Sequence, residues 1–431
     1  MALGKRIPVN SHLVNRSSAT MPRKWYFVLL VSVAIAISYF DRLTLPVAIA
    51  SIQHNIPLSN EQFSWLQTAF LLSYAALYAI GGRLLDWLGT RRGFLLIMLW
   101  WSLACALHSL AAGFVLLLIA RFLLGAGEGG AFPAATRVVA EWIGPPQRST
   151  AMGLINAGTA IGSLLAPPII GFILLHSGWQ AVFVVAGAGG LLWVLWWALS
   201  YPADPAGSPE IRHAQPAAAM RWLDVVRLHN VQAFVFAKFM SDSAWYFLLF
   251  WLPKYLYDAR GFDIRQVSYY AWIPYAASGL GSFLGGWFSS TLLRRGRSLD
   301  AARKIALGCC AAAMPVVMLV SLVPISMALA LFSIAFFAQQ AWSGLVMTLP
   351  ADIFPLNAVG TVAGLIGFGG AIGGAIFGVV AGFLLTHGVT YGGLFVAVGT
   401  FHLIGFAAIV LRAGRIQPFR AAGFEEIGSV A

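Results

Sequence analysis

Four charged residues interrupt stretches of the chain that are otherwise apolar enough to cross a membrane. Asp41 and Arg42 lie in the first long apolar stretch, and Arg121 and Glu128 lie in the fourth. Each such group costs roughly 2.5–3.5 kcal/mol at the centre of a membrane helix, so four of them are rarely kept without a use. We therefore expect these side chains to face a cavity that holds water or a ligand.

The composition places the chain among integral membrane proteins. Of its 431 residues, 59% are hydrophobic and only 10% are charged, and the mean hydropathy is +0.80. These values exclude an ordinary soluble enzyme. The net charge of +12 is not explained by nucleic-acid binding, because the basic residues fall in short segments between apolar stretches. We expect a lipid bilayer as partner, no nucleic acid, no cofactor and no metal site.

Apolar stretches of about 20 residues, the length that crosses a bilayer, occur twelve times. They cover residues 25–50, 62–84, 93–112, 114–138, 149–175, 179–200, 229–257, 266–293, 303–325, 327–350, 357–386 and 390–412. We predict an all-α integral membrane protein with twelve transmembrane helices. Lys and Arg gather in alternate connections, which predicts that both termini are cytoplasmic in a multi-pass plasma membrane protein, here expected in a bacterial inner membrane.

An internal repeat divides the chain into two parts. Residues 153–162 (GLINAGTAIG) recur 211 positions later as residues 364–373 (GLIGFGGAIG). This repeat predicts two pseudo-symmetric six-helix bundles in the same orientation. The predicted organisation is a cytosolic tail at 1–24, a bundle at 25–201, a cytosolic linker at 202–228, a second bundle at 229–413 and a cytosolic tail at 414–431. We expect the protein to function as a monomer.

The connection between the second and third predicted helices, GRLLDWLGTRR, resembles the signature of the major facilitator superfamily. Its signature positions are Gly82, Asp86, Gly89, Arg91 and Arg92. Trp87 stands where the family usually has a cation. The resemblance implies a gate that holds the cytosolic side shut, with the acid meeting the positive end of a helix in the other bundle. The alternative is an ordinary basic cytosolic loop.

Further segments resemble one branch of that superfamily, the anion:cation symporters. They are residues 39–42 (YFDR), 121–128 (RFLLGAGE) and 250–256 (FWLPKYL), while residues 238–245 (KFMSDSAW) and 350–355 (PADIFP) resemble the hexuronate transporters. The resemblance implies proton-coupled import of a small organic anion, a hexuronate such as galacturonate or glucuronate, by alternating access. Alternatives are an aldonate, aldarate or aromatic-acid symporter, an organic-anion exchanger, and, from other classes, a channel or a membrane enzyme.

Helix geometry assigns different roles to neighbouring residues in the first helix. Tyr39 and Arg42 are three residues apart and share a face, whereas Asp41 points about 100° away from Arg42. The planar guanidinium of Arg42 can hold both oxygens of a substrate carboxylate. We therefore predict Arg42 as the anion anchor and Tyr39 as a partner of sugar hydroxyls.

Arg121 and Glu128 are separated by about 10.5 Å of rise and line one stripe of the fourth helix. Burial disfavours an ionised acid, and a nearby arginine favours it. If an arginine moves from an acid to the substrate, the acid loses its nearby cation and takes up a proton; the return of the arginine releases that proton. Our hypothesis is that Asp41 and Glu128 carry the coupling proton, with Arg121 in the substrate site. The alternative is a permanent ion network of Asp41, Arg121 and Glu128.

The remaining substrate candidates come from other helices. Lys238 and Trp245 share a face with Asp242, so Lys238 either supplies a second cation to the substrate or forms a closed pair with Asp242. The amide of Gln339 offers hydrogen bonds or joins helices. Hydroxyl groups of the substrate are also within reach of Tyr74, Asn156 and Thr159, although related aldonate carriers have a glutamine at the position of Thr159.

Overall fold

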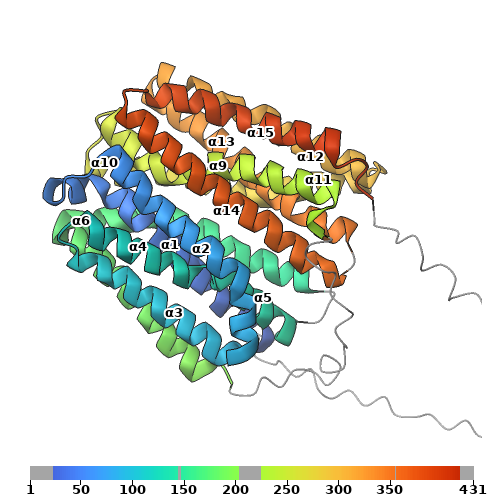
Figure 1. Ribbon diagram of the computed structural model, residues 1–431, viewed down its shortest axis with the longest axis horizontal. Helices are drawn as coiled ribbons and strands as arrows, with labels where there is room; N and C mark the ends of the chain where they lie inside the picture. The colour runs from blue at the N-terminus through green and yellow to red at the C-terminus, as the bar shows by residue number, and fades with distance from the viewer. Residues whose placement is uncertain (1–22, 144–146, 203–224, 355, 418–431) are drawn as a thin grey trace, which may run out of the picture.

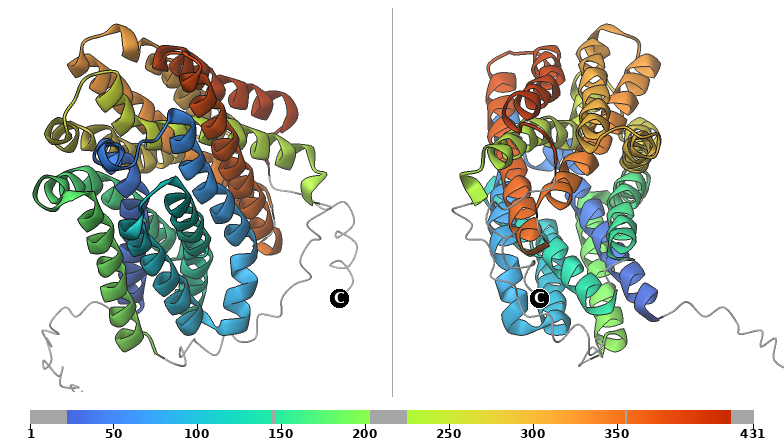
Figure 2. Two further views of the ribbon diagram at one scale, coloured as in Figure 1. Left: turned by 60° about the vertical axis from the view of Figure 1, so that its left-hand side comes forward. Right: turned by 90° about the vertical axis from the view of Figure 1, so that its right-hand side faces the viewer.

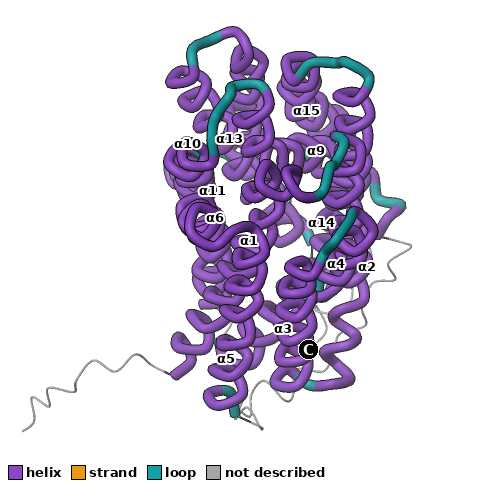
Figure 3. The backbone as a smooth tube through the Cα atoms, turned by 90° about the vertical axis from the view of Figure 1, so that its left-hand side faces the viewer, coloured by secondary structure: helices purple, strands orange, loops and turns teal. Residues whose placement is uncertain are grey.

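The computed structural model describes residues 23–143, 147–202, 225–354 and 356–417. Every regular element within these residues is a helix, which confirms the predicted all-α class (Figure 3). The first part contains α1 (Arg23–Asn55), α2 (Asn60–Leu88), α3 (Thr90–Leu107), η1 (His108–Leu110), α4 (Phe114–Glu128), α5 (Ala131–Trp142) and α6 (Arg148–Ser200). The second contains α9 (His229–Asp258), α10 (Ile264–Tyr270), α11 (Trp272–Arg294), α12 (Leu299–Ala313), η3 (Met314–Leu322), α13 (Ile325–Ile353), α14 (Leu356–Thr386) and α15 (Tyr391–Arg412).

The helix breaks differ from the predicted ones at several points. Helix α6 runs through two predicted spans and bends at Gly178, whose φ of 77° favours glycine. The fourth predicted span is divided into α4 and α5, and the eighth into α10 and α11. Nine stretches of the described residues are long and apolar enough to span a membrane. Counting α6 as two spans and adding α2 and α11 gives twelve.

The helices form two groups, the first in blue to green and the second in yellow to red (Figure 1 and Figure 2). In the first group, α1 packs against α6, and α2 packs against α4. In the second, α9 packs against α14 and α15, and α11 packs against α13. The groups meet where α2 lies along α14 and where α6 contacts α10 and α11. Most of the predicted linker at 202–228 and most of the predicted tails at 1–24 and 414–431 lie outside the described residues, which omit 203–224, 1–22 and 418–431.

The repeated segments occupy equivalent places in the two groups. A Cβ atom on Gly162 of α6 would overlap the carbonyl oxygen of Ala36 in α1. A Cβ atom on Gly373 of α14, the repeat partner of Gly162, would overlap the carbonyl oxygen of Phe239 in α9. Such small residues let two membrane helices approach closely. The repeat is therefore a packing surface that serves both groups in the same way.

Two hydrogen bonds between the groups lie toward one end of the molecule. The hydroxyl of Thr68 donates to the carbonyl of Ala375 at 3.2 Å, and the hydroxyl of Tyr257 donates to the carbonyl of Val47 at 2.9 Å. Both contacts lie in the halves of α1, α2, α9 and α14 that are nearer the α1–α2 turn. This joined end is the one that the distribution of basic residues predicts to be external.

Candidate substrate site

The first group of helices holds a buried ion pair between Arg42 of α1 and Glu128 of α4. The Nε atom of Arg42 lies 2.7 Å from Oε2 of Glu128, and both side chains are at most 1% exposed. Ser38 donates a second hydrogen bond of 2.6 Å to the same oxygen. The guanidinium carbon lies 4.4 Å from the ring centre of Tyr39 and 4.6 Å from that of Tyr74. The structure thus brings three predicted site residues, Glu128, Tyr39 and Tyr74, together around the cation of Arg42.

Asp41 and Arg121 lie beside this pair without hydrogen-bond partners. Both side chains are fully buried, and neither the two oxygens of Asp41 nor the three nitrogens of Arg121 has a hydrogen-bond partner among the described residues. Asp41 lies within electrostatic range of Arg121 and Glu128 and beside Cys105 of α3. As the helix geometry predicts, Asp41 points toward neighbouring helices rather than toward Arg42. Buried opposite charges that lack well-formed hydrogen bonds are costly, so this arrangement favours a change of partners in another state.

The second group holds another buried ion pair, between Lys238 and Asp242 of α9. The Nζ atom of Lys238 lies 2.9 Å from Oδ1 of Asp242 and donates to the hydroxyl of Ser343 at 2.6 Å. Of the two predicted alternatives for Lys238, this state shows the closed pair. Gln339 of α13 donates to Asp242 at 3.5 Å, and its amide oxygen accepts a hydrogen bond from Nε2 of His402 in α15. Sequence reasoning assigns no role to His402, because no local pattern marks it.

The other predicted substrate residues lie in different surroundings. Trp245 packs edge-on against Phe336, with 5.6 Å between ring centres. Asn156 is exposed, and the hydroxyl of Thr159 donates to the backbone carbonyl of Asn156 at 2.8 Å. Asn156 lies one turn before Ala160, which meets Gly279 of α11, so Asn156 faces the boundary between the two groups. Neither Asn156 nor Thr159 hydrogen-bonds to the buried charges within the described part of the chain.

The predicted gating residues lie at the connection between α2 and α3. Gly89 ends α2 and begins α3 with a φ of 74°, a conformation that favours glycine. Arg91 donates to the carbonyl of Ala198 at 2.8 Å and so ties α3 to α6 of its own group, while Arg92 is exposed. The surroundings of Gly82 and the side chain of Asp86 lie outside the part of the structure that is described. The gate therefore remains a prediction.

The PADIFP segment provides a tie between helices at the same end. Asp352 accepts two hydrogen bonds from Arg303 of α12, at 2.7 and 3.1 Å. Arg303 also donates to Ser289 of α11 at 2.8 Å. This bidentate pair has the geometry that makes arginine–carboxylate contacts strong. Asp352 is therefore a structural residue in this state and not part of the charge clusters around Arg42 and Lys238.

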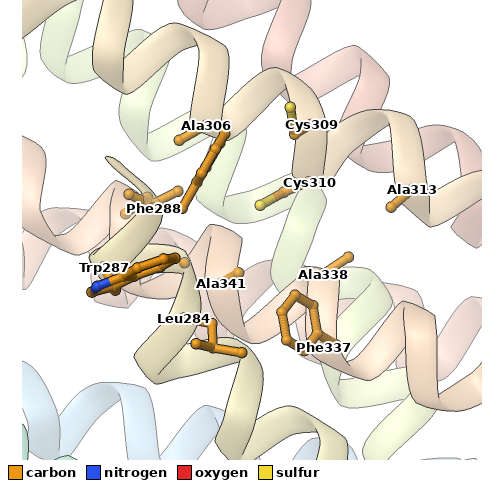
Figure 4. A pocket seen from close by; sticks show the side chains of 12 residues that line it. Leu284, Trp287, Phe288, Ala306, Cys309, Cys310, Ala313, Phe337, Ala338 and Ala341 are labelled. Carbon is orange, nitrogen blue, oxygen red and sulfur yellow. The ribbon is translucent and has the colours of Figure 1, made fainter. Parts of the chain in front are cut away.

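A cavity of about 290 Å³ lies elsewhere, between α11, α12 and α13. Its walls are apolar and include Trp287, Phe288, Cys309 and Phe337 (Figure 4). None of the predicted substrate residues lines it. An anionic substrate requires positive or hydrogen-bonding partners, so this cavity does not serve as its site.

Known proteins resemble the chain over most of its length. A model of the Major Facilitator Superfamily matches residues 31–378. The hexuronate transporter of Escherichia coli K12 is 28% identical over 403 residues, covering 90% of this chain and 93% of that protein. A probable sulfoacetate transporter of Cupriavidus necator is 30% identical over 389 residues, covering 86% and 89%.

Among solved structures, a D-xylose–proton symporter superimposes with a TM-score of 0.71 at 15% identity, covering 92% of this chain and 99% of that one. This likeness concerns the fold alone. It matches the twelve-helix arrangement derived from the helix bounds. The chain thus belongs to the Major Facilitator Superfamily and is a membrane transporter rather than an enzyme.

Proposed function

We propose that the protein is a proton-coupled symporter that imports a sugar acid, most specifically a hexuronate such as galacturonate or glucuronate, by alternating access. Arg42, a fixed buried cation framed by Tyr39 and Tyr74, supports recognition of a carboxylate beside hydroxyl groups. The relative that is named a hexuronate transporter supports the class of substrate.

The balance of buried charges carries the proposal. Around the two ion pairs lie three cations and three acids, namely Arg42, Arg121, Lys238, Asp41, Glu128 and Asp242. When all six are ionised their charges cancel. A monoanionic substrate would add one negative charge to a region with little water, at a high cost in free energy. One proton taken up by a buried acid restores the balance, so at least one proton is expected to move together with the anion.

The Arg42–Glu128 pair provides a route for this exchange. The substrate carboxylate takes the place of Glu128 on the guanidinium of Arg42, which can bind two oxygens. Glu128 then lies buried without its cation, and burial favours its protonated form. When the substrate and the proton leave, Glu128 returns to Arg42. Asp41, close to Arg121 and without a hydrogen-bond partner, is the second acid assigned to proton uptake.

We infer that this state is open toward the cytoplasm. The two groups of helices are joined at the end that has few basic residues, and the exposed Asn156 lies toward the opposite, basic end. With both termini cytoplasmic in a bacterial inner membrane, the joined end is external. Rocking of one group against the other about the buried charges would then expose them to the outside.

Uptake by the purified protein in sealed vesicles tests the proposal. The panel contains galacturonate, glucuronate, galactonate, galactarate and sulfoacetate, with uncharged galactose as the matched control, and pH and voltage gradients are imposed separately. We expect accumulation of a hexuronate that requires an inward proton gradient. Transport of no sugar acid would reject the substrate class, and accumulation that ignores the pH gradient would reject proton coupling.

Substitution of the two first-group acids tests their assignment. Asp41→Asn and Glu128→Gln are each expected to abolish accumulation driven by the pH gradient, because neither variant can exchange a proton at that position. Glu61→Gln, in the first turn of α2, is the control because Glu61 is not part of the buried cluster. Normal gradient-driven accumulation by both buried variants would overturn the assignment.

A further inference from the structure

The second group of helices contains a continuous network of polar side chains, of which all but the half-buried Ser343 are buried. It runs from Ser343 through Lys238, Asp242 and Gln339 to His402, and so joins α9, α13 and α15. Lys238 and Asp242 are less than 10% exposed, and Gln339 and His402 are fully buried. Buried polar networks are costly unless every member forms its hydrogen bonds, which makes this network a candidate for function.

Donor and acceptor chemistry fixes the direction of each hydrogen bond in this polar network. A lysine ammonium can only donate, so Asp242 and Ser343 both accept from Lys238. The amide nitrogen of Gln339 points to Asp242, which leaves its oxygen facing His402. Nε2 of His402 must therefore carry the hydrogen, and its Nδ1 atom lies buried without a hydrogen-bond partner among the described residues. In this way His402 fixes the orientation of the amide that donates to Asp242.

This polar network lies next to Arg42, the predicted anion anchor. Asp242 lies within electrostatic range of Tyr39, the residue of α1 whose ring covers the guanidinium of Arg42. A Cβ atom on Gly370 of α14 would overlap Oδ2 of Asp242, so this glycine makes room for the acid. The titratable groups that face Asp242 are Lys238 and Tyr246 from α9 and Tyr39 from α1, with His402 acting through Gln339.

We propose that Lys238 and Asp242 form a second coupling centre, and that His402 is the residue that positions it. This inference rests on the proposed function. With the substrate carboxylate on Arg42, a hydroxyl oxygen of the sugar accepts a hydrogen bond from Lys238 in place of Asp242. The Asp242 oxygen that loses its contact with Lys238 then binds one proton from the solution. Lys238 remains an ammonium group throughout. In the empty carrier, His402 holds Gln339 so that its amide supports the ionised form of Asp242.

A second coupling centre at Asp242 predicts one additional proton transported with each substrate molecule. Each proton that is taken up together with the substrate adds about one to the slope of log KM against pH above neutrality. Asparagine has the shape of a protonated aspartate but exchanges no proton. Asp242→Asn is therefore expected to lower this slope, and the protons moved per substrate, by about one relative to the wild type.

The stoichiometry is measured from the membrane potential at which net substrate flux vanishes under fixed pH and substrate gradients. A ratio for Asp242→Asn equal to that of the wild type overturns the second centre. Failure of the proposed function would look different, because the wild-type protein itself would then transport no sugar acid or would ignore the proton gradient. Glu61→Gln again serves as the control acid, with an unchanged ratio expected.

Substitutions of His402 test its positioning role. His402→Leu removes the donor to Gln339, whereas His402→Gln places an amide donor near the position of Nε2. Without the donor, Gln339 supports ionised Asp242 less well, so the rise of KM with pH is expected to begin about one pH unit higher. His402→Gln should restore the wild-type profile.

A purely structural role would lower kcat and thermal stability without moving the pH profile. Gln339→Met removes the amide from the other side of the same hydrogen bond and is expected to shift the profile in the same direction as His402→Leu. This variant keeps the inference testable if His402→Leu does not fold. A wild-type pH profile in either folded variant overturns the assignment of His402.

Discussion

The two groups of helices share one scaffold but hold different buried chemistry. Gly162 and Gly373, partners in the repeat, each admit the backbone of a neighbouring helix. The charged residues do not follow the repeat. The first group pairs Arg42 with Glu128 and leaves Asp41 and Arg121 without hydrogen bonds among the described residues. The two groups thus share a mode of helix packing but differ in their buried ionisable residues.

The second group differs because its ion pair is supported on both sides. Lys238 and Asp242 are bonded to each other, and Ser343 and Gln339 extend the network. A satisfied network is more stable than one with unpartnered charges. Our proposal therefore places the largest change of contacts during the transport cycle in the first group, and a smaller change in the second group when the substrate reaches Lys238.

The largest effect is expected when either of the two ion-paired cations, Arg42 or Lys238, is replaced by the other type of basic residue. Arg42→Lys keeps the charge but loses the planar fork, and it should lower kcat/KM for uptake by roughly 100-fold, the equivalent of about 2.7 kcal/mol. Lys238→Arg keeps a charge at a site that a single ammonium serves, so about a 10-fold loss is expected. Initial uptake rates at fixed pH measure both. Equal losses would erase the distinction between the two groups.

The sequence predicts much of this scaffold because the bilayer limits the choices. A hydrophobic thickness that needs about 20 residues per helix makes each span visible in the hydropathy pattern. The repeat at residues 153–162 predicts the equivalent packing of α6 and α14. Helix periodicity also gives the opposite directions of Asp41 and Arg42. The connection between the fifth and sixth predicted spans is less predictable, because one residue with a positive φ, Gly178, is enough to redirect the chain without a loop.

The partners of the buried charges could not be predicted in this way. Arg42 and Glu128 are 86 residues apart, and Gln339 and His402 are 63 apart, so their contacts depend on how helices pack. Local patterns indicate which face a residue occupies but not which helix lies opposite. The helix face of Asn156 predicts a place in the substrate site. The structure shows this residue exposed at the boundary between the groups, and its role in binding stays a prediction.

A smaller effect is expected from filling the shared glycine contacts. Gly162→Ala and Gly373→Ala should each destabilise the protein by roughly 1–3 kcal/mol, because the added methyl group meets a backbone oxygen of the adjacent helix. Gly153→Ala and Gly364→Ala are matched controls from the same repeat, where nothing lies within 4 Å of an added Cβ atom. Thermal unfolding in detergent compares all four. A marked loss in only one of the first two variants would show that the scaffold is less symmetric than the repeat indicates.

The smallest effect is expected from removing the hydrogen bond between Thr68 of α2 and Ala375 of α14, at the joined end of the two groups. Thr68→Val removes the hydroxyl that donates to Ala375 across the two groups, while Thr400→Val removes a hydroxyl that donates to Ala397 within α15. Loss of the first bond should weaken the joined end by about 0.5–1.5 kcal/mol and raise the outward-open population roughly 2- to 10-fold. Spin labels at the outer ends of α2 and α14 report the change as a longer distance. If Thr400→Val produced the same shift, the effect would come from the helices themselves; if neither did, packing along the α2–α14 contact would suffice to hold the two groups together.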